Sequence, residues 1–73
     1  MDSPKHKNLP QLGPKLKQRR LAAGLTQRQL SAKSAVPYTT LTKIESGVIA
    51  NPSLKVIHSL ALTLKISIDD LVG

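Results

Sequence analysis

A short polar stretch near the middle of the chain carries the side chains best suited to hydrogen-bond an extended ligand. Residues 38–46 read YTTLTKIES, in which Leu41 and Ile44 have the spacing of a buried helix stripe. The exposed side of such a helix would carry Tyr38, Thr39, Thr42, Lys43 and Ser46. Hydroxyl and ammonium groups of this kind can pair with base edges in a DNA major groove, although a plain solvated face would look similar.

The flanking residues predict how this helix is held. Apolar residues at Leu30, Val36, Leu41 and Ile44 indicate two short helices joined by a turn near residues 35–36. Helices of about two turns cannot bury a core alone, so they must pack at a steep angle on other helices. This pattern predicts a helix-turn-helix whose second helix enters a major groove.

The charge distribution favours a polyanion as partner. The 73 residues include eleven Lys or Arg and four Asp or Glu, for a net charge of +7. Between Lys5 and Lys65 the only acid is Glu45. Such a field attracts nucleic acid, although a solubilising basic face alone would give a similar composition.

Composition argues against several other classes. The chain has no cysteine, so we expect neither disulfides nor a thiolate metal site, and no apolar run approaches the ~18 residues of a membrane helix. A single tyrosine without Phe or Trp argues against single-strand binding modules. His6 and His58 lack ligand or catalytic partners at useful spacing. We therefore expect no metal, no cofactor and no enzymatic activity, in a cytoplasmic, nucleoid-associated protein.

The periodicity predicts an all-α domain of five helices over residues 11–73, after a flexible basic tail over residues 1–10. The first helix should run from about Leu12 to Ala23 and end at Gly24. Thr26 and Gln29 form a predicted capping box for a second helix, which ends near Ser34. The inward residues of the first helix are expected to be Leu12, Leu16 and Leu21.

Three further helices complete the prediction. One opens with Pro37 at its first position and ends at Gly47. Ser53 caps the next, whose inward residues are expected to be Leu54, Ile57, Leu60, Ala61 and Leu64. Ser67 caps the last, with Asp69 and Asp70 in its first turn.

From Leu12 to Leu71 the chain resembles the lambda-repressor/Cro-like (Xre-type) helix-turn-helix family of prokaryotic and phage regulators. The matching pieces are Leu12-Gly13, Leu16, Arg20, GLTQ at 24–27, Leu30, Val36, Leu41, Ile44-Glu45, Gly47, NPS at 51–53 and SIDDL at 67–71. The resemblance implies a compact five-helix domain that binds duplex DNA sequence-specifically, usually as a two-fold dimer on a palindromic operator.

The resemblance also implies roles for particular residues. It places the Gln27 amide on a phosphate with Arg28 nearby, and it pairs Arg20 with Glu45 in a shielded ion pair that orients two helices. Arg20 could then touch a phosphate as well. Tyr38, Thr39, Thr42 and Lys43 are the predicted base readers, and Thr40 and Ser46 are added to the predicted phosphate contacts.

Departures from the family pattern mark the ends of several elements. Ala35 and Lys65 stand where glycine is common, so left-handed backbone there would be strained. Val48 and Ile49 follow Gly47, where basic residues are common. We expect a homodimer interface formed by Val48, Ile49, Ile68, Leu71 and Val72, unless Val48 and Ile49 fold back onto the fourth helix.

Two function classes remain open. The first is a DNA-binding transcriptional regulator, most often a repressor, in a phage, restriction–modification or toxin–antitoxin setting. The second is an antitoxin or adaptor of the same fold whose main role is to bind a protein partner such as a toxin.

Overall fold

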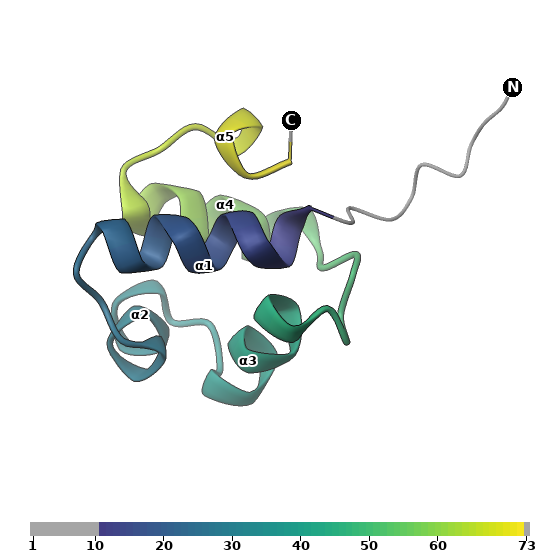
Figure 1. The fold of residues 1–73 in the computed structure, drawn as a ribbon, viewed down its shortest axis with the longest axis horizontal. Helices are drawn as coiled ribbons and strands as arrows, with labels where there is room; N and C mark the ends of the chain where they lie inside the picture. The colour runs from purple at the N-terminus through teal and green to yellow at the C-terminus, as the bar shows by residue number, and fades with distance from the viewer. Residues whose placement is uncertain (1–10, 73) are drawn as a thin grey trace, which may run out of the picture.

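The computed structural model describes residues 11–72, which form five α-helices. They are α1 (Leu12–Ala22), α2 (Gln27–Ser34), α3 (Tyr38–Ser46), α4 (Leu54–Leu64) and α5 (Ile68–Val72). In Figure 1, α1 crosses the middle in front of α4, while α5 lies above them and α2 and α3 lie below. The predicted all-α class is confirmed. The predicted basic tail, residues 1–10, lies outside the described residues.

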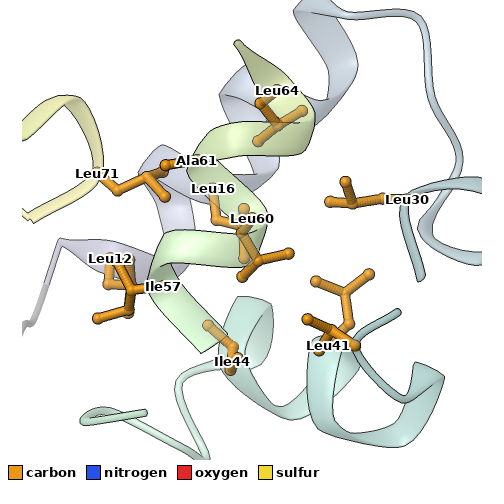
Figure 2. Close-up of a cluster of buried hydrophobic side chains, with 11 residues drawn as sticks. Leu12, Leu16, Leu30, Leu41, Ile44, Ile57, Leu60, Ala61, Leu64 and Leu71 are labelled. Atoms are coloured by element: carbon orange, nitrogen blue, oxygen red, sulfur yellow. The ribbon is translucent and has the colours of Figure 1, made fainter. Parts of the chain in front are cut away.

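One apolar core joins all five helices (Figure 2). Leu16, Leu30, Leu41 and Leu71 have no measurable exposure, and they come from four different helices. The rest of the core consists of Leu12, Val36, Ile44, Ile57, Leu60, Ala61 and Leu64. Because each helix contributes a stripe too small to bury alone, α2 and α3 depend on α1 and α4 for their position.

Two of the residues predicted to face the core, Leu21 and Leu54, are exposed, so these predictions are wrong. Leu21 is 57% exposed, because it lies about 140° around the helix from Leu16, at about 100° per residue, and Arg20 takes the inward position. Leu54 is 69% exposed. It is the first residue of α4, between the exposed Ser53 and Lys55, where the chain has just left the preceding loop.

Local hydrogen bonds explain where α2 and α5 begin. Thr26 Oγ1 accepts from the Gln29 N–H at 3.1 Å, and Gln29 Oε1 accepts from the Thr26 N–H at 2.9 Å, which confirms the predicted capping box. Ser67 and Asp70 form an equivalent reciprocal pair at the start of α5. The hydrogen bonds from Ser67 lower the pKa of the Asp70 carboxyl, with a smaller contribution from Arg19.

Residues with positive φ angles follow four of the helices, and the one after α1 is the predicted Gly24, at +75°. Gly47, at +88°, ends α3 without strain, whereas Ala35 at +62° and Lys65 at +59° carry side chains in the same backbone region. Each of these two residues costs about 1–2 kcal/mol relative to a relaxed conformation. The predicted left-handed geometry at Ala35 is therefore present, and packing of the flanking helices offsets its cost.

The predicted start of α3 is wrong by one residue. Pro37 is the N-cap, with an extended ψ of 141°, and the helix begins at Tyr38. The Pro37 carbonyl already accepts the first intrahelical bond from the Leu41 N–H at 2.9 Å, as an N-cap carbonyl does. Since no side chain caps this end, packing of Val36 and Leu41 in the core holds the entry to the helix.

Helices α1 and α3 approach each other closely at Gly13. A Cβ at this position would lie 2.7 Å from the Glu45 carbonyl oxygen and 2.9 Å from that of Ile44. Both are backbone atoms, so no side-chain movement could relieve the contact. The glycine lets the C-terminal half of α3 lie directly against α1.

Gly13→Ala should destabilise the fold by about 1–3 kcal/mol, because the new methyl group must push α1 and α3 apart. The same change at an ordinary helix position would stabilise by about 0.5–1 kcal/mol. Urea unfolding followed by circular dichroism measures the difference, with Gln18→Ala on the exposed side of α1 as control. A Gly13→Ala variant as stable as the parent would show that the two helices can separate freely.

Candidate nucleic-acid interface

The four predicted base readers lie together on the outer side of α3. Thr39 and Lys43 are exposed, and Tyr38 and Thr42 are half-buried. With Ser46 they span an arc of about 140° opposite the buried Leu41 and Ile44. Thr40 is half-buried at the edge of this arc. We call Tyr38, Thr39, Thr42, Lys43 and Ser46 the α3 outer face.

Hydrogen bonds within the helix decide what two of these side chains can still offer. The Thr42 hydroxyl donates to the Thr39 carbonyl at 2.9 Å, and the Ser46 hydroxyl donates to the Lys43 carbonyl at 3.2 Å. Both oxygens therefore remain as acceptors, and Thr42 also presents a methyl group. Within residues 11–72 no hydrogen bond engages the Lys43 ammonium, which leaves its three donors available for a ligand.

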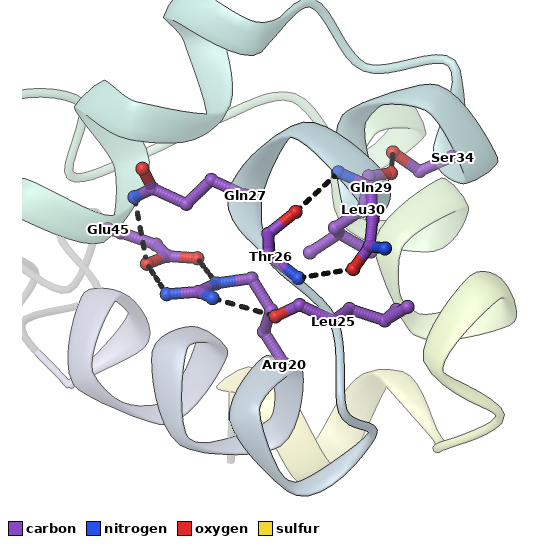
Figure 3. A network of polar contacts seen from close by, with 8 residues as sticks. All are labelled: Arg20, Leu25, Thr26, Gln27, Gln29, Leu30, Ser34 and Glu45. Atoms are coloured by element: carbon purple, nitrogen blue, oxygen red, sulfur yellow. Dashed lines mark hydrogen bonds and ion pairs between the residues drawn. The ribbon is translucent and has the colours of Figure 1, made fainter.

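A buried polar network fixes the helix that carries this face (Figure 3). Arg20 on α1 donates from Nε to Glu45 Oε2 at 2.7 Å and from Nη2 to Glu45 Oε1 at 3.0 Å. A third nitrogen, Nη1, donates to the Leu25 carbonyl at 2.8 Å. The side chains of Arg20 and Glu45 are 8% and 4% exposed. This two-point contact links α1 to α3 and fixes their mutual orientation.

Gln27 completes the same network from the start of α2. Its Nε2 donates to Glu45 Oε1 at 3.1 Å, so one carboxylate holds side chains from α1 and α2 (Figure 3). This bond orients the Gln27 amide. Arg20, at 7% exposure and with all three nitrogens donating to protein atoms, offers little surface to a phosphate. We therefore leave Arg20 out of the proposed DNA contacts and regard it as structural.

Sequence reasoning missed a contact between two of the predicted site residues. The Arg28 guanidinium carbon lies 4.2 Å from the centroid of the Tyr38 ring and over its face. The two residues belong to different helices and are separated by the turn after α2, so no periodicity relates them. A cation over an aromatic face is attracted by the negative charge density there.

Lys17 is a further cation at this site that sequence reasoning did not single out. It lines a cleft between α1, the start of α2 and α3, whose other walls are Arg20, Gln27, Thr42, Glu45 and Ser46. Lys17 is exposed and lies three residues before Arg20, one turn earlier on a similar side of α1. That spacing is the signal that could have identified it.

The predicted dimer residues divide into an exposed and a buried group. Val48 is 73% exposed, whereas Leu71 has no exposure and belongs to the core. The expectation that Leu71 forms part of an interface is wrong, because α5 packs on α1 and α4 and buries this side chain. Ile49, Ile68 and Val72 are half-buried against the core. The Ile49 N–H also donates to the Lys43 carbonyl at 2.9 Å, and this hydrogen bond holds the backbone of Ile49 against the last turn of α3.

Among residues 11–72, no three His, Cys, Asp or Glu side chains come together as a set able to hold a metal ion. None of the five helices has the length and apolar character needed to cross a membrane.

Comparison with solved structures finds close matches of the whole fold. The N-terminal DNA-binding domain of SinR from Bacillus subtilis matches with a TM-score of 0.84 and 27% identity, covering 86% of this chain and 91% of that one. A crystal structure of SinR in complex with DNA matches with a TM-score of 0.83 and 27% identity, covering 85% and 98%.

A restriction–modification controller is also similar. The controller protein C.AhdI from Aeromonas hydrophila matches with a TM-score of 0.80 and 33% identity, covering 86% of this chain and 94% of that one. Comparison with curated protein sequences finds no significant match. The helix-turn-helix family model matches residues 16–71, which include all of α2 and α3 and the part of α1 from Leu16 onward. The chain therefore belongs to the Xre-type, lambda-repressor-like helix-turn-helix family of transcriptional regulators.

Proposed function

We propose that this protein is a repressor that binds duplex DNA sequence-specifically, as a homodimer on a palindromic operator, in the cytoplasm at the nucleoid. The observation that carries the proposal is the α3 outer face, which combines three small hydroxyl side chains, one tyrosine and one lysine. The buried ion pair of Arg20 with Glu45 holds this helix on α1. A helix of this kind fits the major groove, where each base pair presents a distinct pattern of donors and acceptors. The SinR structure with DNA supports the same partner.

Residue roles follow from exposure and remaining hydrogen-bond capacity. Lys43 can donate to guanine O6 and N7, and the Thr42 oxygen can accept from an amino group of adenine or cytosine. Thr39 and Tyr38 complete the base-reading set. The proposed phosphate contacts come from the edges of the site: Gln27, Arg28, Thr40 and Ser46.

Selection of bound duplexes from a random pool tests the proposal directly. We expect enrichment of an inverted repeat, and protection of that repeat in a footprint upstream of the protein's own gene. Capture of a stoichiometric protein partner, with no duplex enriched at low salt, would instead favour the protein-binding alternative.

Lys43→Ala should reduce discrimination at one base pair per half-site by about 1–3 kcal/mol, because it removes the donor proposed to read a guanine. Affinities for a panel of single base-pair variants of the selected duplex measure this loss. Lys33→Ala, which removes a charge that is also exposed, from the last turn of α2, serves as control and should weaken all duplexes alike. If both variants keep the parent's base preferences, Lys43 reads no base.

We propose that the homodimer forms through exposed apolar residues near the loop between α3 and α4. Of the predicted set, Val48 and half-buried Ile49 lie on this loop, and half-buried Ile68 and Val72 on α5 stay in the proposed interface. Leu54, at 69% exposure, is an addition. Exposed aliphatic side chains of this size on one segment favour an isologous contact across a two-fold axis. Such a dimer would place two α3 helices about 34 Å apart, on half-sites about 10 bp apart.

Val48→Glu should shift the protein toward monomer without unfolding it, because the side chain is already in water and a charge at the dyad would face its own copy. Sedimentation equilibrium at concentrations where the parent dimerises measures the change. Leu62→Glu is a matched control, since Leu62 is 69% exposed, close to the 73% of Val48, but lies on α4 away from this loop. If Leu62→Glu disrupts the dimer and Val48→Glu does not, the interface lies on α4.

A further inference from the structure

Arg28 and Tyr38 join the first turns of the two helices of the helix-turn-helix. Arg28 is the second residue of α2, and Tyr38 is the first residue of α3. The guanidinium carbon lies 4.2 Å from the ring centroid. Tyr38 is half-buried while Arg28 is exposed, so the ring is the better anchored of the two groups.

This contact reduces the entropy that the Arg28 side chain would lose on binding a ligand. A long side chain free in water must lose its rotational freedom when it binds, and that loss weakens the complex. A guanidinium held over an aromatic face has lost part of this freedom already. The guanidinium keeps its hydrogen-bonding capacity over the ring, because its five N–H donors lie in its own plane and the attraction to the ring uses none of them as a conventional hydrogen bond.

Those donors have no partner within the protein's described part. No hydrogen bond or ion pair between two of the residues 11–72 engages the Arg28 guanidinium, whereas each of the three side-chain nitrogens of Arg20 donates to another of these residues. The two arginines thus differ in their contacts: Arg20 joins helices through its hydrogen bonds, and Arg28 is exposed and lies over the Tyr38 ring.

We propose that Tyr38 is a positioning residue that orients Arg28, so that the guanidinium donates two N–H groups to a pair of neighbouring acceptors on DNA. The inference rests on the proposed function and reassigns Tyr38, which then supports a DNA contact without reading a base itself. Two sources supply such an acceptor pair: two phosphate oxygens, or O6 and N7 of a guanine near the N-terminal end of α3.

Binding of the selected duplex tests whether the two residues act as a unit. Tyr38→Leu and Arg28→Gln should each weaken binding about tenfold, and the double variant should be no weaker than either single variant. Tyr38→Phe keeps the ring and should bind within about twofold of the parent. Lys33→Gln, a charge removed from the same helix away from the ring, should combine multiplicatively with Tyr38→Leu.

Two outcomes would overturn the proposal. Losses that multiply in the Tyr38→Leu, Arg28→Gln double variant would mean that the residues act independently. A Tyr38→Phe variant as weak as Tyr38→Leu would mean that the hydroxyl makes the contact. Thermal melts followed by circular dichroism verify that each variant is folded at the assay temperature.

The same variants identify the source of the acceptors. If Arg28 contacts a guanine, Arg28→Gln abolishes preference at one base pair per half-site. If it contacts a phosphate, all duplexes weaken alike and the salt slope falls by about one per protomer. Tyr38 can orient Arg28 toward a guanine or toward a phosphate, and the two patterns of loss distinguish these acceptors.

The free protein provides a readout that does not depend on DNA. Tyr38 is the only tyrosine, and the chain has no Phe or Trp, so ring-current shifts in the Arg28 side-chain NMR signals that depend on Tyr38 report on this contact. We expect upfield shifts of the Arg28 δ and ε protons that vanish in Tyr38→Leu. Unshifted signals in the parent would overturn the inference. Shifted signals in a protein that binds no duplex would instead refute the proposed function and leave the contact standing.

Discussion

Raising the salt concentration from about 50 to about 200 mM should weaken binding of the dimer to its operator by about ten-thousandfold. If each protomer neutralises about four phosphates, a dimer displaces about eight sets of counterions, and the log–log slope is about −7. The net charge of +7 and the exposed cations around α3, among them Lys17, Arg28 and Lys43, support this number. Fluorescence anisotropy of a labelled duplex across a salt series measures the slope.

The comparison duplex should have the same length and an unrelated sequence. Phosphate contacts persist on such DNA while base contacts are lost, so its slope should be similar and its affinity lower at every salt concentration. A slope shallower than about −3 on a selected operator would mean that the basic residues around α3 do not form the contact surface.

Features that depend on near neighbours in the chain could be predicted from the sequence. The capping box of Thr26 and Gln29, the end of α3 at Gly47 and the cap at Ser53 each involve residues within one helical turn. Apolar spacing also identified most of the core. The ion pair of Arg20 with Glu45 joins residues 25 apart, and only the family resemblance indicated it.

The errors have two causes. Leu21 is exposed because Arg20 takes the inward position on α1, which the helical period indicates, whereas Leu71 is buried because α5 packs on α1 and α4. Spacing within α5 gives no indication that α1 and α4 cover it. The contact between Arg28 and Tyr38 and the close approach at Gly13 likewise depend on the angle between helices, which no local pattern encodes.

Glu45→Ala should destabilise the fold by about 3 kcal/mol, well beyond the effect of removing an exposed acid. The substitution leaves the Arg20 guanidinium, 8% exposed, without its counterion and without two of its three hydrogen bonds. Removing one partner of a buried pair costs about 3–5 kcal/mol, because a desolvated charge remains uncompensated. For a domain of this size the midpoint of thermal unfolding should fall by about 15 °C or more.

Matched variants isolate the cause of this loss. Asp69→Ala removes an equivalent charge from the exposed first turn of α5 and should cost only a few tenths of a kcal/mol, about the value of a helix-dipole contact. The double variant with Arg20→Ala should recover part of the loss, since no stranded charge remains. Free energies that simply add across the cycle would show that the two side chains do not stabilise each other.

Glu45→Ala also separates two contributions to DNA binding: the orientation of α3 and the net charge of the protein. Glu45→Ala raises the net charge by one, so electrostatic attraction alone predicts tighter binding at low salt. The network on Glu45, however, also holds the Gln27 amide and fixes α3 against α1. We therefore expect affinity for the selected operator to fall at a temperature where the variant is still folded, while affinity for unrelated duplex stays equal or rises. An equal gain on both duplexes would mean that the orientation of α3 does not depend on this carboxylate.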